Sequence, residues 1–234
     1  MRRGLFGKLQ AKRDFVSQGA PRGFLTAFEP WLQGGVASSR AQLGAEWRAA
    51  YLTAPIWRFW LGPQLCGGAT AIGAFMPSMD GVGRYFPFSV AMFAEEGESL
   101  PPPEADPQDG WFVAIEDFLL STLEQGVVFE SVLEALEALP APALGATGAR
   151  LLTPETVAAA RVGEAGFGEA CRLARETVAR ARAVADQSFW WTEGGDGFER
   201  FALAATGMPD PALFVAMITG RFTSPAPGGE ARAP

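Results

Sequence analysis

The polar side chains with the most suggestive spacing are Ser78, Asp80 and Arg84, which lie in the stretch FMPSMDGVGRYFPF at residues 75 to 88. A serine becomes a nucleophile when a base lies within hydrogen-bond reach, and Asp80 is two residues away. An aspartate is nevertheless a weak base unless burial raises its pKa. Hydrolysis with Ser78 as the nucleophile is therefore one hypothesis for this stretch, and it requires that the surroundings of Asp80 raise its pKa.

The same residues also have a structural explanation as a turn. Asp80 is expected to accept backbone N–H bonds within its own turn, with Gly81 and Gly83 supplying positive φ angles. Arg84 is expected to pair with a carboxylate. Because a loop fixed between strands presents its side chains in a preorganised way, we favour a rigid loop that displays an aspartate and an arginine to another protein.

The composition excludes most other chemistry. The chain contains no histidine, so it lacks the usual proton shuttle near neutral pH and the commonest transition-metal ligand. Its two cysteines, Cys66 and Cys171, are far apart and form no CxxC motif. The sequence also holds no phosphate-binding glycine loop and no cluster of metal-binding aspartates. We therefore expect no catalytic residue, no cofactor and no metal site.

Charge and hydropathy restrict the class of partner and the compartment. The chain has 234 residues, 48% of them hydrophobic, and a formal net charge of −7. This size can bury one substantial core, and the negative charge argues against nucleic acid as a partner. The start of the sequence holds no apolar run of signal-peptide length, and no run anywhere has the length of a membrane span. We expect a cytoplasmic protein without membrane insertion.

Short aromatic or apolar stretches bounded by glycine or proline predict about six strands. They are residues 4 to 9, 57 to 62, 69 to 76, 85 to 93, 188 to 193 and 199 to 206. The three between 57 and 93 are joined by short turns, which favours an antiparallel meander, and the last two are expected to form a hairpin across GGDG.

Helical periodicity fills the intervals between these strands. Helices are expected at about 30 to 51, over the stripe from Trp111 to Thr122 with Asp109 as its cap, and at 130 to 139, 167 to 186 and 210 to 219. In the first of these helices Pro30 is expected in the first turn, and Gly34 and Gly35 form its weak point.

These elements predict an α/β domain over residues 1 to 222. Its central sheet is expected to be mixed but largely antiparallel and to be flanked by helices on both faces, as a three-layer sandwich. The proline-rich segments 95 to 110 and 140 to 149 are interpreted as surface connections, and residues 223 to 234 as a disordered tail.

The adjacent tryptophans Trp190 and Trp191 lie in a predicted strand, so they point to opposite faces of the sheet. If helices cover both faces, both tryptophans belong to the core; if one face is open, one of them contributes to an exposed patch that marks an interface. Arg58 stands between two aromatic residues and needs a carboxylate partner if it is buried. Asp14 and Asp80 are the candidate partners.

Six ordered stretches of the chain resemble the successive motifs of the TagF family, also called ImpM, of type VI secretion-associated proteins. They are GLFGKLQAKRDFVSQGAP (4 to 21), WLQGGVASSRAQLGAEW (31 to 47), YLTAPIWRFWL (51 to 61), MPSMDGVGRYFPFSVA (76 to 91), SFWWTEGG (188 to 195) and GMPDPALF (207 to 214). The chain departs from the family pattern at Arg13, where the family usually has glycine, and at Gly81, where arginine is common.

The resemblance implies an α/β sandwich that regulates without catalysis. TagF-like proteins are cytoplasmic, post-translational repressors of type VI secretion, and the implied partner is the forkhead-associated scaffold protein of that system. A small-ligand sensor or hydrolase that uses Ser78 and Asp80 is the alternative function. The residues expected to contact a partner are Ser78, Asp80, Arg84, Asp14, Arg58, Trp190 and Trp191.

Overall fold

The computed structural model describes residues 1–145, 149–153, 157–162 and 166–222, and the predicted tail at 223–234 lies outside them. Its main sheet has seven strands in the order β2-β1-β5-β4-β3-β8-β9, and every neighbouring pair is antiparallel. The strands are β1 (Arg2–Gly7), β2 (Val16–Gln18), β3 (Trp57–Leu61), β4 (Ala71–Met76), β5 (Phe88–Phe93), β8 (Gln187–Thr192) and β9 (Phe201–Thr206). The predicted three-layer sandwich with a largely antiparallel sheet is confirmed; the main sheet has one strand more than expected and is antiparallel throughout, where a mixed sheet was expected.

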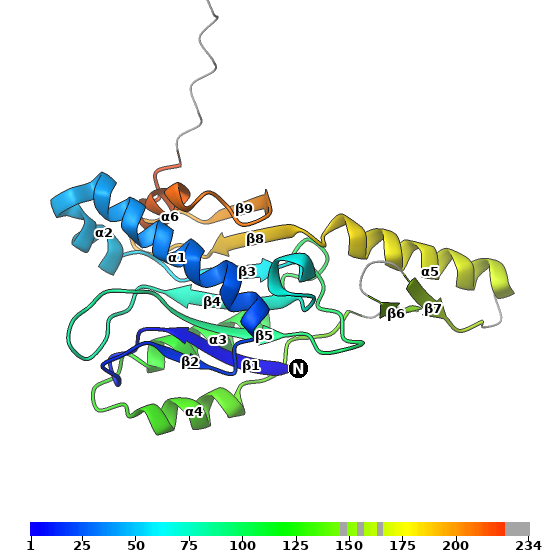
Figure 1. Ribbon diagram of the computed structural model, residues 1–234, viewed down its shortest axis with the longest axis horizontal. Helices are drawn as coiled ribbons and strands as arrows, with labels where there is room; N and C mark the ends of the chain where they lie inside the picture. The colour runs from blue at the N-terminus through cyan, green and yellow to red at the C-terminus, as the bar shows by residue number, and fades with distance from the viewer. Residues whose placement is uncertain (146–148, 154–156, 163–165, 223–234) are drawn as a thin grey trace, which may run out of the picture.

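Helices cover both faces of this sheet, as Figure 1 shows. On one face lie α1 (Arg22–Leu43), α2 (Trp47–Leu52) and α6 (Phe214–Thr219), and on the other lie α3 (Asp109–Ser121) and α4 (Phe129–Ala138). The alternation of side chains along each strand produces two cores, one for each layer of helices. Along β3, for example, Phe59 belongs to the α1 side and Trp60 to the α3 side.

A separate lobe extends from the end of the sheet layers. It consists of the hairpin β6 (Ala149–Thr153) and β7 (Val157–Ala160) with the helix α5 (Gly166–Ala183) packed on it, as Figure 1 shows. Half of the residues of α5 are exposed, and Ala170 is its one buried residue. The helix was predicted from the sequence, but both strands were missed, because neither segment contains an aromatic residue or alternates between apolar and polar residues.

The helix α1 begins at Arg22, eight residues before the predicted start near Pro30. Pro21 occupies the N-cap with an extended backbone, and buried residues recur at helical spacing from Phe24 onward. Pro30 lies inside the helix on an exposed position, so the backbone hydrogen bond that it removes faces solvent. The expectation that Pro30 marks the first turn was therefore wrong.

The two glycines of α1 permit close packing. A Cβ atom at Gly35 would lie 2.8 Å from the Cβ of Phe214 in α6, and one at Gly34 would lie 3.0 Å from the Cβ of Pro211. Both distances are tighter than ordinary van der Waals contact, so only glycine lets the C-terminal segment lie this near α1. Gly34 and Gly35 are thus a packing site within a continuous helix, where the sequence analysis expected a weak point.

The start of β5, the cap of α3 and the presence of the strand β2 also differ from the predictions. The strand β5 begins at Phe88 because Pro87 has no N–H to donate, although Tyr85 forms an isolated bridge with Met79. Asp109 lies in the first turn of α3 and is not its cap, since Gln108 holds that position. The short strand β2 was not predicted, because three residues are too few to show a period.

Trp190 connects the C-terminal part of the chain to the core. Its ring centroid lies 4.4 Å from that of Trp31 and 5.6 Å from that of Phe59, and the side chain is fully buried. We expect Trp190→Ala to lower the free energy of unfolding by about 3–5 kcal/mol, measured by urea denaturation. Trp191→Ala is the matched control and should cost less, because this half-buried ring packs chiefly on Phe112. Equal losses would contradict this assignment.

Candidate functional site

The loop between β4 and β5 is held by the carboxylate of Asp80. This side chain has no exposed surface, and it accepts hydrogen bonds from the backbone N–H groups of Val82 and Arg84 at 3.1 and 2.8 Å. Its second oxygen accepts from Nε of Arg84 at 2.6 Å and lies 3.0 Å from Nζ of Lys8. The predicted bonding of Asp80 within its own turn is therefore observed, together with two cationic partners.

These contacts keep Asp80 ionised. Burial alone would raise the pKa of the carboxyl, but the donors from Arg84, Lys8 and Val82 together hold that pKa well below its usual range. A carboxylate with a lowered pKa and occupied oxygens is a poor proton acceptor. Asp80 is thus suited to fixing the loop and poorly suited to activating a nucleophile.

Lys8 was missed by the sequence analysis although it is central to this cluster. It follows β1 directly and is buried, and its ammonium group also lies 5.0 Å from the ring centroid of Phe15. A signal was available in the sequence, since Lys8 is one of only two lysines and stands within the apolar run that was predicted as a strand. A charge in such a run requires a buried counter-charge.

Arg84 extends the cluster to the surface. Its Nη2 donates to the carbonyl of Arg13 and lies 3.5 Å from a carboxylate oxygen of Asp14. Its side chain is 56% exposed, and the neighbouring carboxylate of Asp80 raises its pKa. Arg84 therefore ties the β4–β5 loop to the connection between β1 and β2, and its outer part remains open to a partner.

Ser78 lies at the base of the loop and is not presented to solvent. Its backbone N–H donates to the hydroxyl of Tyr51, and this hydroxyl donates to the carbonyl of Ser78, each at 3.0 Å. Burial raises the pKa of Tyr51, which keeps the phenol protonated as this donor requires. Of the two loop glycines, Gly83 has a positive φ of 84°, whereas Gly81 does not, so the expectation for Gly81 was wrong.

Arg58 belongs to a different cluster on the α3 side of the sheet. It is buried, and its guanidinium contacts Glu116 at 2.6 Å, Glu193 at 3.1 Å and Asp109 at 3.5 Å. It also lies 5.0 Å from the ring centroid of Phe112. A carboxylate partner was expected from the sequence, but the two candidates, Asp14 and Asp80, pair with other cations. The observed partners come from helix α3 and the end of β8, and their pairing depends on tertiary structure.

The seven predicted site residues thus occupy three places. Asp80, Arg84 and Asp14 meet at the loop, with Ser78 beneath them. Arg58 and Trp191 oppose each other across β3 and β8 and both contact Phe112. Trp190 lies in the core on the α1 side.

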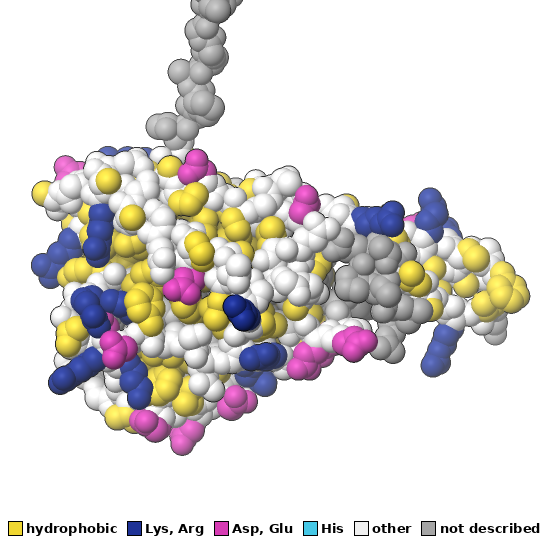
Figure 2. All heavy atoms as spheres, in the orientation of Figure 1, with side chains coloured by type: hydrophobic (Ala, Val, Ile, Leu, Met, Phe, Trp, Pro, Cys, Tyr) yellow, Lys and Arg dark blue, Asp and Glu magenta, His cyan; other side chains and the backbone are white. Residues whose placement is uncertain are grey.

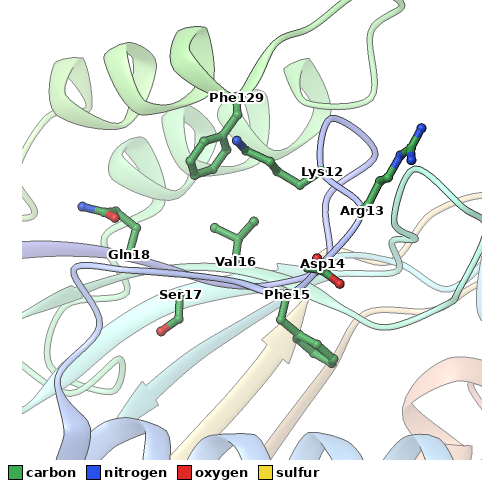
Figure 3. Close-up of a pocket in the computed structure, with 8 residues that line it drawn as sticks. All are labelled: Lys12, Arg13, Asp14, Phe15, Val16, Ser17, Gln18 and Phe129. Carbon is green, nitrogen blue, oxygen red and sulfur yellow. The ribbon is translucent and has the colours of Figure 1, made fainter.

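A shallow hollow lies beside the loop, next to the edge strand β2, as Figure 3 shows. It has a volume of about 270 Å³, and neither Ser78 nor Asp80 lines it. The ammonium of Lys12 lies 4.4 Å from the ring centroid of Phe129 at its border. Its lining residues are Lys12, Arg13, Asp14, Phe15, Val16, Ser17, Gln18 and Phe129.

The described ranges also bear on metal binding and on membrane insertion. Within them, no group of three or more His, Cys, Asp or Glu side chains is placed to hold a metal ion. None of the helices described there is long and apolar enough to cross a membrane.

The fold is that of an α/β sandwich protein, and the buried charges of Lys8 and Asp80 fix its β4–β5 loop, which presents Arg84 at the surface. The chain belongs to the TagF family: residues 4–139 match the family model described as TagF N-terminal domain, type VI secretion system-associated. It is also similar to a solved structure, PA0076 from Pseudomonas aeruginosa PAO1, with 33% identity and a TM-score of 0.75. That alignment covers 97% of this chain and 99% of the other. A comparison with curated proteins found no match.

The loss of the Asp80 carboxylate is expected to destabilise the protein. In Asp80→Asn, Lys8 remains buried without an anionic partner, and removal of one member of a buried ion pair typically costs about 3–5 kcal/mol. Urea denaturation at neutral pH should show a loss of this size. Asp14→Asn is the matched control, because its side chain is 93% exposed and its loss should leave stability unchanged.

The same carboxylate should contribute to acid sensitivity. Because the pKa of Asp80 is lower in the folded state, its contribution is complete above about pH 4 and is lost as the pH falls toward the folded pKa. The wild-type protein should therefore lose more stability between about pH 4 and pH 2 than Asp80→Asn does. Parallel stability curves for the two proteins would refute this role.

Proposed function

We propose that this protein is a cytoplasmic, non-catalytic regulator that represses type VI secretion post-translationally by binding the forkhead-associated scaffold protein. Membership of the TagF family supports a regulatory role in type VI secretion. The observation that carries the binding mode is the buried cluster around Asp80, which fixes the β4–β5 loop in one conformation. A loop that is ordered before binding loses little conformational entropy when a partner docks on it.

The alternative function, a hydrolase or small-ligand sensor that uses Ser78 and Asp80, has less support. Ser78 is buried, and the carboxylate of Asp80 is occupied by four donors. The hollow near the loop is lined by other residues. Both polar residues therefore stabilise the loop from within, and among the predicted site residues at this end Arg84 and Asp14 remain available to a partner.

The experiment measures binding of the purified chain to the purified scaffold by calorimetry, and secretion of a type VI effector by cells that overproduce the chain. Val82→Asp changes the loop surface without touching the cluster, because Val82 contributes only its backbone N–H and its side chain is 57% exposed. We expect this variant to fold normally, to bind at least about tenfold more weakly and to relieve repression.

Val113→Asp is the matched control, because this valine is 54% exposed on α3. It should bind and repress like the wild-type protein. Absence of any binding between the wild-type chain and the scaffold would reject the proposed partner, and equal binding by both variants would exclude the loop tip as the contact.

A further inference from the structure

Basic side chains gather at the end of the molecule where the β4–β5 loop lies. They come from three segments that are distant in sequence: the β1–β2 connection, the helices α1 and α2, and the loop itself. Figure 2 shows dark blue side chains scattered over this end, at the left of the view. The set, which we call the basic end, consists of Lys12, Arg13, Arg40, Arg48 and Arg84.

Side-chain contacts connect the three segments. The guanidinium of Arg48 lies 5.8 Å from the ring centroid of Tyr85, the residue that follows Arg84. The side chain of Arg84 reaches the carbonyl of Arg13 on the β1–β2 connection. The guanidinium of Arg40 lies 4.2 Å from the ring centroid of Trp47, which itself contacts Tyr85. These contacts place the three segments next to one another at this end of the molecule.

Most of these cations lack a carboxylate partner. Over the part of the chain that the structure describes, Lys12, Arg13, Arg40 and Arg48 form no ion pair within 4.0 Å, and three of them lie over aromatic rings. By contrast, Arg172 on α5 binds two glutamates of its own helix. A ring face orients a cation without neutralising its charge, so the basic end carries uncompensated positive charge in a chain of net charge −7.

The hollow beside β2 adds an apolar element to the basic end. Val16 and Phe129 contribute apolar surface to it, and Lys12 and Arg13 contribute positive charge. Its volume of about 270 Å³ is below the usual range for cofactor or drug-sized ligands, but it is large enough for one amino-acid side chain. Phe15, which is 48% exposed, gives further apolar surface at this border.

We propose that the basic end binds an acidic segment of a partner protein, with an apolar side chain of that segment in the hollow beside β2. A short acidic segment interacts with charges within about 8 Å, the Debye length at physiological ionic strength, and so experiences the local cations. A long nucleic acid or an anionic membrane also faces the rest of a chain with charge −7 and is repelled by it. The exposed carboxylate of Asp14 excludes acidic groups from one part of the hollow and thereby limits the register of the segment.

This inference rests on the proposed function in naming a partner protein, and it adds the surface and the chemistry that the partner must present. Two probes test separately the identity of the partner and the surface that binds it. One is the purified scaffold, and the other is a fluorescent glutamate-rich peptide with a single phenylalanine, compared with its glutamine counterpart. Fluorescence anisotropy of the intact chain with each probe gives the affinity and its dependence on salt.

The variant Lys12→Glu/Arg13→Glu reverses the charge beside the hollow, and we expect it to weaken peptide binding by about tenfold or more. Arg161→Glu/Arg175→Glu is the matched control, because both arginines are exposed on the lobe and the net charge changes from −7 by the same amount. The control should bind as the wild-type protein does. Wild-type affinity should also fall with rising salt, and the glutamine peptide should bind more weakly.

Several outcomes would overturn the inference: no binding of the glutamate peptide by the wild-type chain, equal affinities for both double variants, or tighter binding of an oligothymidine or of anionic vesicles. If the scaffold binds the wild-type chain and Lys12→Glu/Arg13→Glu equally, the proposed function stands and this surface is wrong. If the peptide result holds but the scaffold does not bind, the surface stands and the proposed partner is wrong. Thermal melting of each variant checks that the fold is retained.

Discussion

The carboxylate of Asp80 is the constraint on which one whole end of the molecule depends. It is fully buried, yet it is charged, because Lys8, Arg84 and two backbone N–H groups surround it. Such a group is stable only when every one of these donors is in place, so the end of β1, the β4–β5 loop and the β1–β2 connection must adopt a single relative arrangement. The cluster therefore determines the conformation of this end of the molecule as well as its stability, and the exposed side chains of the β4–β5 loop are held in fixed positions.

The charged residues of this protein fall into two groups: some are buried and paired, and others are exposed. Lys8, Asp80 and Arg58 are buried and paired, and they hold strands and helices in register. Lys12 and Arg13, only a few residues from Lys8, instead face the hollow without a carboxylate partner among the described residues. The sheet order explains this difference, because β1 lies inside the sheet, whereas β2 is its edge. One short segment of sequence thus supplies both an internal ion pair and an open basic surface.

The sequence predicts the layered architecture because its strands are short, aromatic and bounded by turn residues. It also predicts the turn at Asp80, because an aspartate followed by glycines commonly bonds to its own backbone. The features that the sequence does not predict depend on contacts between segments that are distant in the chain. Glu116 and Glu193 as partners of Arg58 become evident only when α3 and β8 are placed beside β3. The start of α1 at Arg22 follows from burial against the sheet, which outweighs the signal of Pro30. The basic end was missed for the same reason, since its arginines are scattered along the chain and the net charge is negative.

The pairing of β3 with β8 has a consequence for synthesis on the ribosome. The strand β8 leaves the ribosome only after α3, α4 and the lobe of β6, β7 and α5 have been made. Until then one edge of β3 has no partner, and Trp31 and Phe59 lack the cover of Trp190. A nascent chain in this condition exposes both a strand edge and aromatic surface, which are the features that chaperones bind and that promote aggregation. Completion of the sheet is therefore a late step in folding, because β3 must wait for β8 and β9 to follow all the intervening elements in the chain.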